Sequence, residues 1–139
     1  MSLARKPGPA TLADLEALPP TWRGEILDGE LHVFPHPDFL HNLLAGNVLG
    51  DLRGPFQKGR GGPGGWRILF GPGIHLTRAP EFAPDLAGWH RTTMTGPLRD
   101  ERITLVPDWI CEILSPSTRG YDLITKRRFY AEIGVPYLW

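Results

Sequence analysis

The sequence predicts a fold of helices and strands, α/β or α+β, with one mixed central sheet flanked by helices, and we take the α/β class as the expectation. The predicted elements run in the order helix, hairpin, helix, several strands, helix and strand, as in domains where helices and strands share one core. The chain has 139 residues, 41% of them hydrophobic, so it can bury the core of one domain. No internal repeat divides it. We therefore expect a single domain over residues 1–139.

The N-terminal segment predicts a short helix and a hairpin. An arm and a helix are expected in residues 1–20, with Thr11 as the cap of residues 12–18. Residues 25–34 predict a β-hairpin, because the pair Asp28-Gly29 suits a two-residue type I′ turn.

A second helix is predicted over residues 39–53, where apolar side chains recur with helical spacing. The Gly/Pro-rich segment 54–65 that follows predicts a flexible loop. The apolar residues that define the helix are Leu40, Leu43, Leu44, Val48 and Leu52.

The second half of the chain predicts strands and one more helix. The helix covers residues 121–133 and ends at Gly134. A helix after a buried strand usually returns the chain to the sheet, so residues 137–139 are expected beside the preceding strand. The earlier predicted strands cover residues 66–70, 73–77, 82–89 and 108–114.

Composition excludes several classes of protein. A single cysteine, Cys111, excludes an internal disulfide and a cysteine-rich zinc site. No apolar run is long enough to span a membrane, and the N-terminus lacks the apolar core of a secretion signal. We therefore expect a cytoplasmic protein without a membrane partner.

The distribution of charge is more informative than its sum. The net charge is zero, so bulk charge does not indicate a nucleic-acid partner. Basic residues nevertheless concentrate in the middle of the chain, where no acid interrupts them between Leu52 and Glu81. Such a segment can face phosphate groups, although a solvated surface explains it equally. The candidates for nucleic-acid contact are Arg53, Lys58, Arg60 and Arg67.

Two carboxylates lie inside apolar, strand-like runs. Glu112 stands in the run from Trp109 to Leu114, and Asp85 stands in the predicted strand 82–89. Neighbouring strands are about 5 Å apart, so these two carboxylates could share one magnesium ion. Asp108 shares the face of Glu112 but lies about 13 Å from it along a strand, too far for one ion.

Lys126 is predicted to point toward the sheet. It shares a helical face with Leu123, Tyr130 and Ile133. One interpretation is a lysine that extends along the edge of the core with its ammonium in water. The other is a lysine that meets the two carboxylates and stabilises charge in a reaction.

The run PDLAGW, followed by PDWICEILSPSTRGYDLITKRRFYAEIGVPYLW, resembles the Uma-type family of restriction endonucleases in the PD-(D/E)XK nuclease superfamily. The resemblance implies a restriction-endonuclease-like fold. It also implies a metal-dependent endonuclease that uses Mg²⁺ or Mn²⁺ to hydrolyse phosphodiester bonds in nucleic acid, most naturally DNA.

By this resemblance, Asp85 and Glu112 are the metal-binding carboxylates. The superfamily lysine would stand at Leu114, which is apolar here, so Lys126 resembles its migrated replacement. His41 and Glu25 match positions near the family's site. A solvent-facing ring for His41 and a surface acid for Glu25 remain alternatives.

Two other functions stay open. The resembling family continues past Trp139 with further strands, so the chain could be a truncated, non-catalytic oligomerisation or nucleic-acid-binding domain. An uncovered strand edge would then recruit a second copy, and we expect a homodimer. Ser115, Ser117 and Thr118 lack the surroundings of a serine nucleophile and predict a turn. A sugar hydrolase with two carboxylates has no stacking platform to support it.

Overall fold

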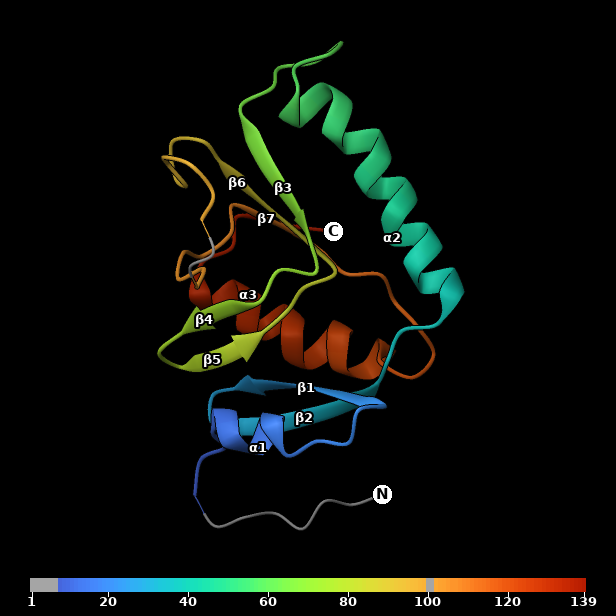
Figure 1. The fold of residues 1–139 in the computed structure, drawn as a ribbon, viewed down its shortest axis with the longest axis vertical. Helices are drawn as coiled ribbons and strands as arrows, with labels where there is room; N and C mark the ends of the chain where they lie inside the picture. The colour runs from blue at the N-terminus through green and yellow to red at the C-terminus, as the bar shows by residue number, and fades with distance from the viewer. Residues whose placement is uncertain (1–7, 100–101) are drawn as a thin grey trace.

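The computed structural model describes residues 8–99 and 102–139. The first seven residues of the predicted N-terminal arm lie outside this range. The described chain forms two four-stranded sheets with helices packed against them (Figure 1). The predicted α/β class is confirmed, with two sheets in place of one central sheet.

The first sheet is built on the predicted hairpin, with strand order β2-β1-β5-β4. At the hairpin turn Asp28 has φ 49° and Gly29 has φ 80°. Two consecutive positive φ angles are the requirement of a type I′ turn, so the predicted turn is confirmed. The strands are β1 (Trp22–Leu27), β2 (Glu30–Pro35), β4 (Ile74–Leu76) and β5 (Ala79–Phe82).

The second sheet is the mixed one, with strand order β3-β6-β7-β8. The pairs β3–β6 and β6–β7 are antiparallel, whereas β8 runs parallel to β7. The return of the chain to this sheet after the last helix was predicted and is confirmed. The strands are β3 (Trp66–Phe70), β6 (Leu86–His90), β7 (Trp109–Cys111) and β8 (Tyr137–Leu138).

The strand predicted over residues 82–89 is in fact two strands in different sheets. Strand β5 ends at Phe82 and β6 begins at Leu86. Pro84 lies between them and has no N–H to offer a ladder, which favours a break at this point. Asp85 therefore sits at the start of β6, where the chain passes from one sheet to the other.

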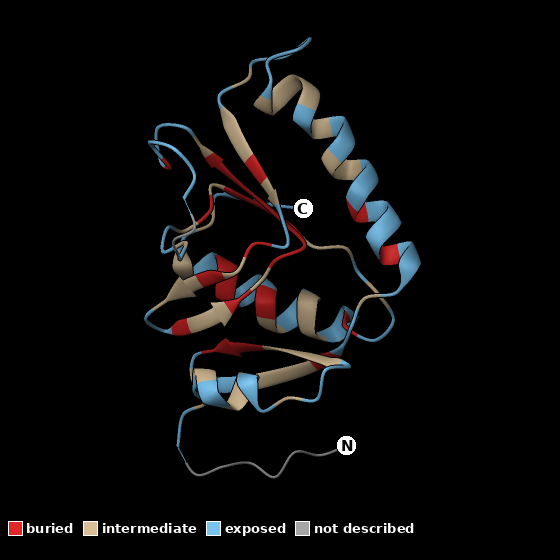
Figure 2. Ribbon diagram, viewed as in Figure 1, coloured by how far each residue is buried: buried red, intermediate tan, exposed pale blue. Residues whose placement is uncertain are grey.

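The helices agree with the predicted positions but differ in which faces are buried. In α2 (Phe39–Leu52), Leu40, Leu43 and Leu44 are 44–54% exposed, so the predicted leucine face is wrong in this half. Most of this helix is drawn as exposed or intermediate in Figure 2. The residues of α2 that are buried or pack on the core are His41, Ala45, Val48, Leu49 and Leu52.

The remaining helices are short, and two turns have π-helical geometry. A π-turn, η1 (Arg53–Gln57), continues α2 into the segment predicted as a loop. The C-terminal helix consists of a π-helical part, η2 (Tyr121–Lys126), and an α-helical part, α3 (Arg127–Ile133). The short α1 (Leu12–Glu16) follows Thr11, whose N–H donates to the Asp14 carboxylate at 2.8 Å, as predicted.

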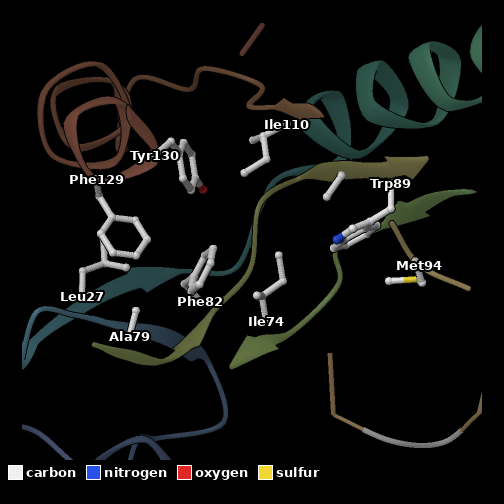
Figure 3. Packing of buried hydrophobic residues seen from close by; sticks show 10 residues of the cluster. Leu27, Ile74, Ala79, Phe82, Trp89, Met94, Ile110, Phe129 and Tyr130 are labelled. Carbon is white, nitrogen blue, oxygen red and sulfur yellow. The ribbon is translucent and has the colours of Figure 1, made fainter. Parts of the chain in front are cut away.

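The main apolar core joins the two sheets to the C-terminal helix. Phe82 and Phe129 meet edge to face with ring centroids 5.2 Å apart, and Trp89 and Ile110 of the second sheet belong to the same cluster (Figure 3). The helix is thereby fixed against both sheets. No helix in the described residues is long and apolar enough to cross a membrane.

Candidate active site

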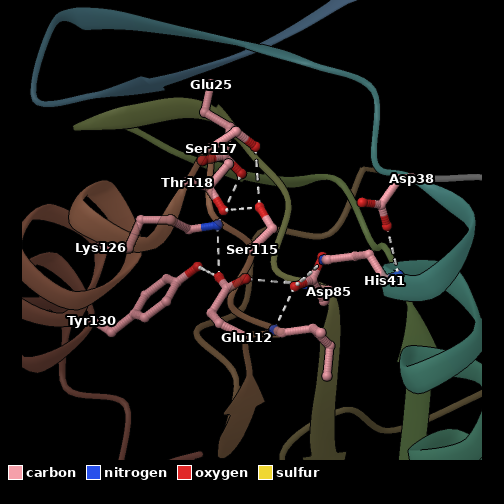
Figure 4. A network of polar contacts seen from close by, with 11 residues as sticks. Glu25, Asp38, His41, Asp85, Glu112, Ser115, Ser117, Thr118, Lys126 and Tyr130 are labelled. Atoms are coloured by element: carbon pink, nitrogen blue, oxygen red, sulfur yellow. Dashed lines mark hydrogen bonds and ion pairs between the residues drawn. The ribbon is translucent and has the colours of Figure 1, made fainter.

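Asp85 and Glu112 lie next to each other where strands β6 and β7 meet the first sheet. Leu86 pairs with Cys111 in the antiparallel ladder, so the residues one step beyond, Asp85 and Glu112, are also neighbours. The Asp85 N–H lies 3.4 Å from Oε2 of Glu112, and the Ile113 N–H donates to Oδ2 of Asp85 at 2.7 Å. Their predicted adjacency is confirmed (Figure 4).

One detail of that prediction was wrong. Strand β7 ends at Cys111, so Glu112 follows the strand instead of standing in its middle. The Glu112 N–H still donates to the Trp139 carbonyl at 3.1 Å, whereas the next one, the Ile113 N–H, donates to the Asp85 side chain in place of a neighbouring strand. A carboxylate at a strand end can face a cleft while its backbone stays anchored.

Lys126 points toward Glu112, and together with Asp85 and Glu25 these residues form a buried polar cluster. Its Nζ lies 2.6 Å from Oε1 of Glu112 and 3.1 Å from Oε1 of Glu25. The residue is only 3% exposed, so the alternative of an ammonium extended into water is wrong. Figure 4 shows the lysine reaching from the C-terminal helix toward Glu112.

Glu25 is part of the cluster and is not a surface acid of the hairpin. It is 5% exposed on β1, and its two oxygens accept hydrogen bonds from the Ala83 N–H at 2.9 Å and the Tyr121 hydroxyl at 2.9 Å. Glu25, Leu27 and Arg23 share one face of the strand, because side chains alternate. That face turns toward the C-terminal helix.

His41 also faces the cluster, and the alternative of a solvent-facing ring is wrong. Asp38 caps helix α2 by accepting the His41 N–H at 2.9 Å, which fixes the first turn. The ring Nε2 then lies 3.0 Å from Oδ2 of Asp85, and the residue is 7% exposed. The sequence pattern missed this because it assigned the inward face of α2 to the leucines.

Two tyrosines complete the cluster, and the sequence analysis did not assign them a role. The Tyr130 hydroxyl donates to Oε1 of Glu112, and the Tyr121 hydroxyl donates to Glu25. Tyr130 could have been found, because it lies four residues after Lys126 on a helix. Tyr121 could not, because five residues separate it from Lys126 and only a π-turn brings such a pair to one face.

The same π-turn corrects the predicted position of Leu123. An α-helical pattern placed Leu123 on the inward face, but the side chain is 42% exposed. In η2 the Arg127 N–H reaches the carbonyl of Asp122, five residues back. The wider turn shifts the inward face to Tyr121 and Lys126.

The cluster carries more negative than positive charge. The side chains of Glu25, Asp85, Glu112 and Lys126 are each at most 9% exposed, so three buried carboxylates face one buried ammonium. Burial raises the pKa of Glu112 to about 8; Lys126 opposes this rise, and Asp85 and Glu25 add to it. Burial alone would lower the pKa of Lys126, but Glu112 and Glu25 hold it above its ordinary value.

The donor chemistry of the cluster fits a hard divalent cation. Carboxylate oxygens are the ligands that Mg²⁺ prefers, and Mg²⁺ commonly binds through one or two carboxylates and keeps several waters. When all three carboxylates are ionised, which for Glu112 takes a pH above about 8 or a nearby cation, they exceed the one ammonium by two negative charges, and one divalent ion would balance these. Within the described residues, no three His, Cys, Asp or Glu side chains surround a common point. Asp85 and Glu112 are the two carboxylates that the ends of β6 and β7 bring next to each other.

The basic residues proposed to contact nucleic acid are not beside this cluster. Arg53 follows the last residue of α2, about 18 Å along the helix from His41. Figure 1 shows the segment after α2 at the end of the second sheet opposite the C-terminal helix. Lys58 and Arg60 are exposed there, and Arg67 on β3 donates to the Gly96 carbonyl.

The residues set aside in the sequence analysis have structural roles. Asp108 accepts the His90 N–H at 2.8 Å and so ties the start of β7 to β6. The Ser115 hydroxyl bonds those of Ser117 and Thr118 at 3.1 and 2.9 Å, in the turn that was predicted. Leu114, at the position of the superfamily lysine, is 46% exposed.

The arrangement of two sheets and flanking helices is a mixed α/β fold that a solved structure shares. A crystal structure described as "a putative nuclease belonging to DUF820" from Anabaena variabilis ATCC 29413 is similar, with a TM-score of 0.62 and 21% sequence identity. The match covers 86% of this chain and 65% of that chain, so this chain spans less than two thirds of its neighbour's length.

The chain belongs to the Uma2 family. The family model, described as "Putative restriction endonuclease", matches residues 10–139. A comparison with curated proteins found no match. The predicted family and fold are therefore confirmed, and the family points to a nuclease.

Proposed function

We propose that the chain is a metal-dependent endonuclease that hydrolyses phosphodiester bonds in DNA. One observation carries the proposal: Asp85 and Glu112 lie side by side at the ends of neighbouring strands, and Glu112 contacts the buried Lys126. Ionised groups away from water lose several kcal/mol of hydration, and only pairing and hydrogen bonds among them offset that cost. A cluster of this kind is therefore more easily explained by a function than by stability. Family membership supports the same reaction class.

Asp85 and Glu112 would hold Mg²⁺ or Mn²⁺. When bound, such an ion polarises the scissile phosphate and lowers the pKa of an attacking water. The protein prepares for it by fixing both carboxylates: the Ile113 N–H and His41 hold Asp85, and Tyr130 holds Glu112. His41 is thus a positioning residue for Asp85.

Lys126 would stabilise charge on the phosphate as the bond breaks. An ammonium has three N–H donors, of which two face Glu25 and Glu112, so the third would be the one to meet a phosphate oxygen or a water. Glu25 fixes the direction of that third donor and is therefore a positioning residue for Lys126. Fixed donors in a dry site are worth more than mobile ones in water.

A cleavage assay on plasmid and linear DNA tests the proposal, with Mg²⁺, Mn²⁺ or EDTA. We expect cleavage only with a divalent ion, and its loss in Asp85→Ala. Asp51→Ala is the matched control, because Asp51 is an exposed acid of α2 away from the cluster. Cleavage in EDTA, or equal cleavage by Asp85→Ala, would contradict the assignment.

Thermal unfolding separates metal binding from turnover. Mg²⁺ should raise the melting temperature of the wild type and of Lys126→Met, and should have no effect on Asp85→Ala. DNA binding without any cleavage, in a protein that takes up no metal, would favour the non-catalytic module. One observation favours that alternative: Lys126 contacts Oε1 of Glu112, so a side chain occupies one of the oxygens proposed to bind the metal.

We further propose a homodimer in a reducing, cytoplasmic setting. Strand β8 is an edge strand of the second sheet, and Tyr137 and Trp139 are 59% and 65% exposed. Exposed apolar strand edges favour pairing with another strand. Cys111 is free and buried, and a free thiol is typical of proteins in a reducing compartment such as the cytoplasm. Sedimentation should show a dimer that Trp139→Lys weakens; a monomer at micromolar concentration would contradict it.

A further inference from the structure

A pocket of about 300 Å³ opens beside the carboxylate cluster at the N-terminal end of α2. The strand β1, the end of β2, the first turn of α2 and the turn after β7 form its wall. Its polar lining includes Arg23, His36, Asp38, His41, Ser117 and Thr118. His41 belongs both to this wall and to the cluster, because its Nε2 contacts Asp85. The pocket and the proposed metal ligands are thus separated by one imidazole ring.

Arg23 is a cation without an anion. It lies two residues before Glu25 on the same face of β1, and its guanidinium carbon sits 5.9 Å from the centre of the Phe34 ring. Among the described residues it has no ion pair or hydrogen bond, and its Nε is buried without an acceptor. Buried polar atoms are nearly always paired, so this Nε–H is available to a group that the described residues do not supply, such as a water or a bound anion.

His41 presents a second buried atom that lacks a partner. Its Nε2 faces a carboxylate and therefore carries hydrogen, while its Nδ1 is buried and has no partner among the described residues. A water could donate one hydrogen to Nδ1 and the other to a bound anion. This would satisfy the nitrogen with the ring neutral.

The rest of the lining permits an anion. Oδ1 of Asp38, the one acid in the wall, already accepts the His41 N–H at the start of α2. The helix of 14 residues adds its partial positive charge at this end. The hydroxyls of Ser117 and Thr118 already have Ser115 as a hydrogen-bond partner, so we do not assign them as donors to the bound anion.

We propose that this pocket binds a phosphate group of the nucleic-acid strand, one that neighbours the phosphate cleaved at Asp85. The guanidinium of Arg23 would donate from Nε and a terminal nitrogen to two phosphate oxygens, a geometry that suits arginine. The proposal rests on the proposed nuclease function. It adds a substrate subsite that positions the strand and leaves the chemistry to the cluster.

Two measurements in EDTA test the pocket without any cleavage. The first is titration of inorganic phosphate, followed by the backbone amide resonances of His41 and Ser117 in the pocket wall, which every variant keeps. The second is the salt dependence of binding to a short DNA duplex. Arg23→Gln should weaken phosphate binding at least tenfold and lower the salt slope by about one. Arg23→Lys keeps the charge but loses the paired donors, so its phosphate affinity should lie between that of the wild type and that of Arg23→Gln.

Arg99→Gln is the matched control. Arg99 is an exposed arginine in the loop after β6, outside the pocket lining, and its loss should leave phosphate affinity unchanged. The proposal would be overturned if Arg23→Gln and Arg99→Gln reduced phosphate binding equally. It would also be overturned if the wild type bound no phosphate. If Arg23→Gln does not fold, the comparison of Arg23→Lys with Arg99→Lys decides in the same way.

The outcome is separable from the nuclease proposal. If the wild type binds phosphate through Arg23 but never cleaves DNA with Mg²⁺ or Mn²⁺, the pocket stands and the proposed reaction falls. If the wild type cleaves DNA and Arg23→Gln alters neither phosphate binding nor the salt slope, the reaction stands and the pocket falls.

Discussion

Phe129 and Tyr130 are adjacent in α3 and both rings lie in the apolar cluster, yet only Tyr130 also reaches the polar cluster around Glu112. Phe129 packs in the apolar cluster with Phe82, whereas the Tyr130 hydroxyl reaches Glu112 in the polar cluster. The apolar cluster is stabilised by each side chain it buries. The polar cluster is stable only as a set, because each charge compensates another. Four changes can separate these two kinds of burial.

Phe82→Ala should give the largest effect on stability. Phe82 is fully buried between the sheets and the C-terminal helix, so its truncation should lower the free energy of unfolding by about 3–5 kcal/mol. Urea titration measures this loss. It should be similar at pH 5 and pH 8, because no titrating group is involved.

Lys126→Met should cost about 3 kcal/mol at pH 8, because it leaves buried carboxylates without their ammonium. The loss should shrink at pH 5, where Glu112 carries a proton. Arg128→Met is the control: its side chain is 76% exposed, and an exposed ion pair contributes about 1 kcal/mol or less. A loss of stability that does not change with pH would show that Lys126 stabilises the fold through packing and not through its charge.

Stability itself should depend on pH through Glu112. Its pKa in the folded protein, about 8, lies above the ordinary value of 4.5, so the folded state binds more protons between these values. The free energy of unfolding should therefore fall as pH rises through this window, by on the order of 3–4 kcal/mol between pH 5 and pH 8 without metal. Glu112→Gln should flatten the curve, as urea titrations at pH 5 and pH 8 would show.

Tyr130→Phe should have the smallest effect. It removes one hydrogen bond to Glu112 and leaves the buried ring in place, so the expected loss is about 1–2 kcal/mol. The titration of Glu112, followed by carboxyl NMR, should shift upward, since the anion loses a donor. An unchanged titration would show that the hydroxyl does not bond this carboxylate in solution.

The sequence was sufficient for features that depend on local pattern. The turn at Asp28-Gly29 follows from residue types that tolerate positive φ. Asp85, Glu112 and Lys126 could be found because each is a charge inside an apolar pattern, and charges there need partners. Family resemblance then connected them and also pointed to His41 and Glu25.

The features that were missed depend on contacts between distant segments. The division into two sheets follows from pairing between strands, which the alternation of residues 82–89 does not encode. The inward face of α2 is set by Asp85, which lies 44 residues after His41 and bonds its ring. The role of Tyr121 depends on a π-turn, which has no dependable sequence signal.

The π-turn η2 also has a consequence for changes in chain length. Tyr121 and Lys126 both reach Glu25 because a π-turn places residues five apart on one face. Deletion of the exposed Ile124 would leave them four apart, and an ordinary α-helix aligns such a pair. An insertion would leave them six apart, which neither helix aligns. This segment should therefore accept the loss of one residue far better than the gain of one.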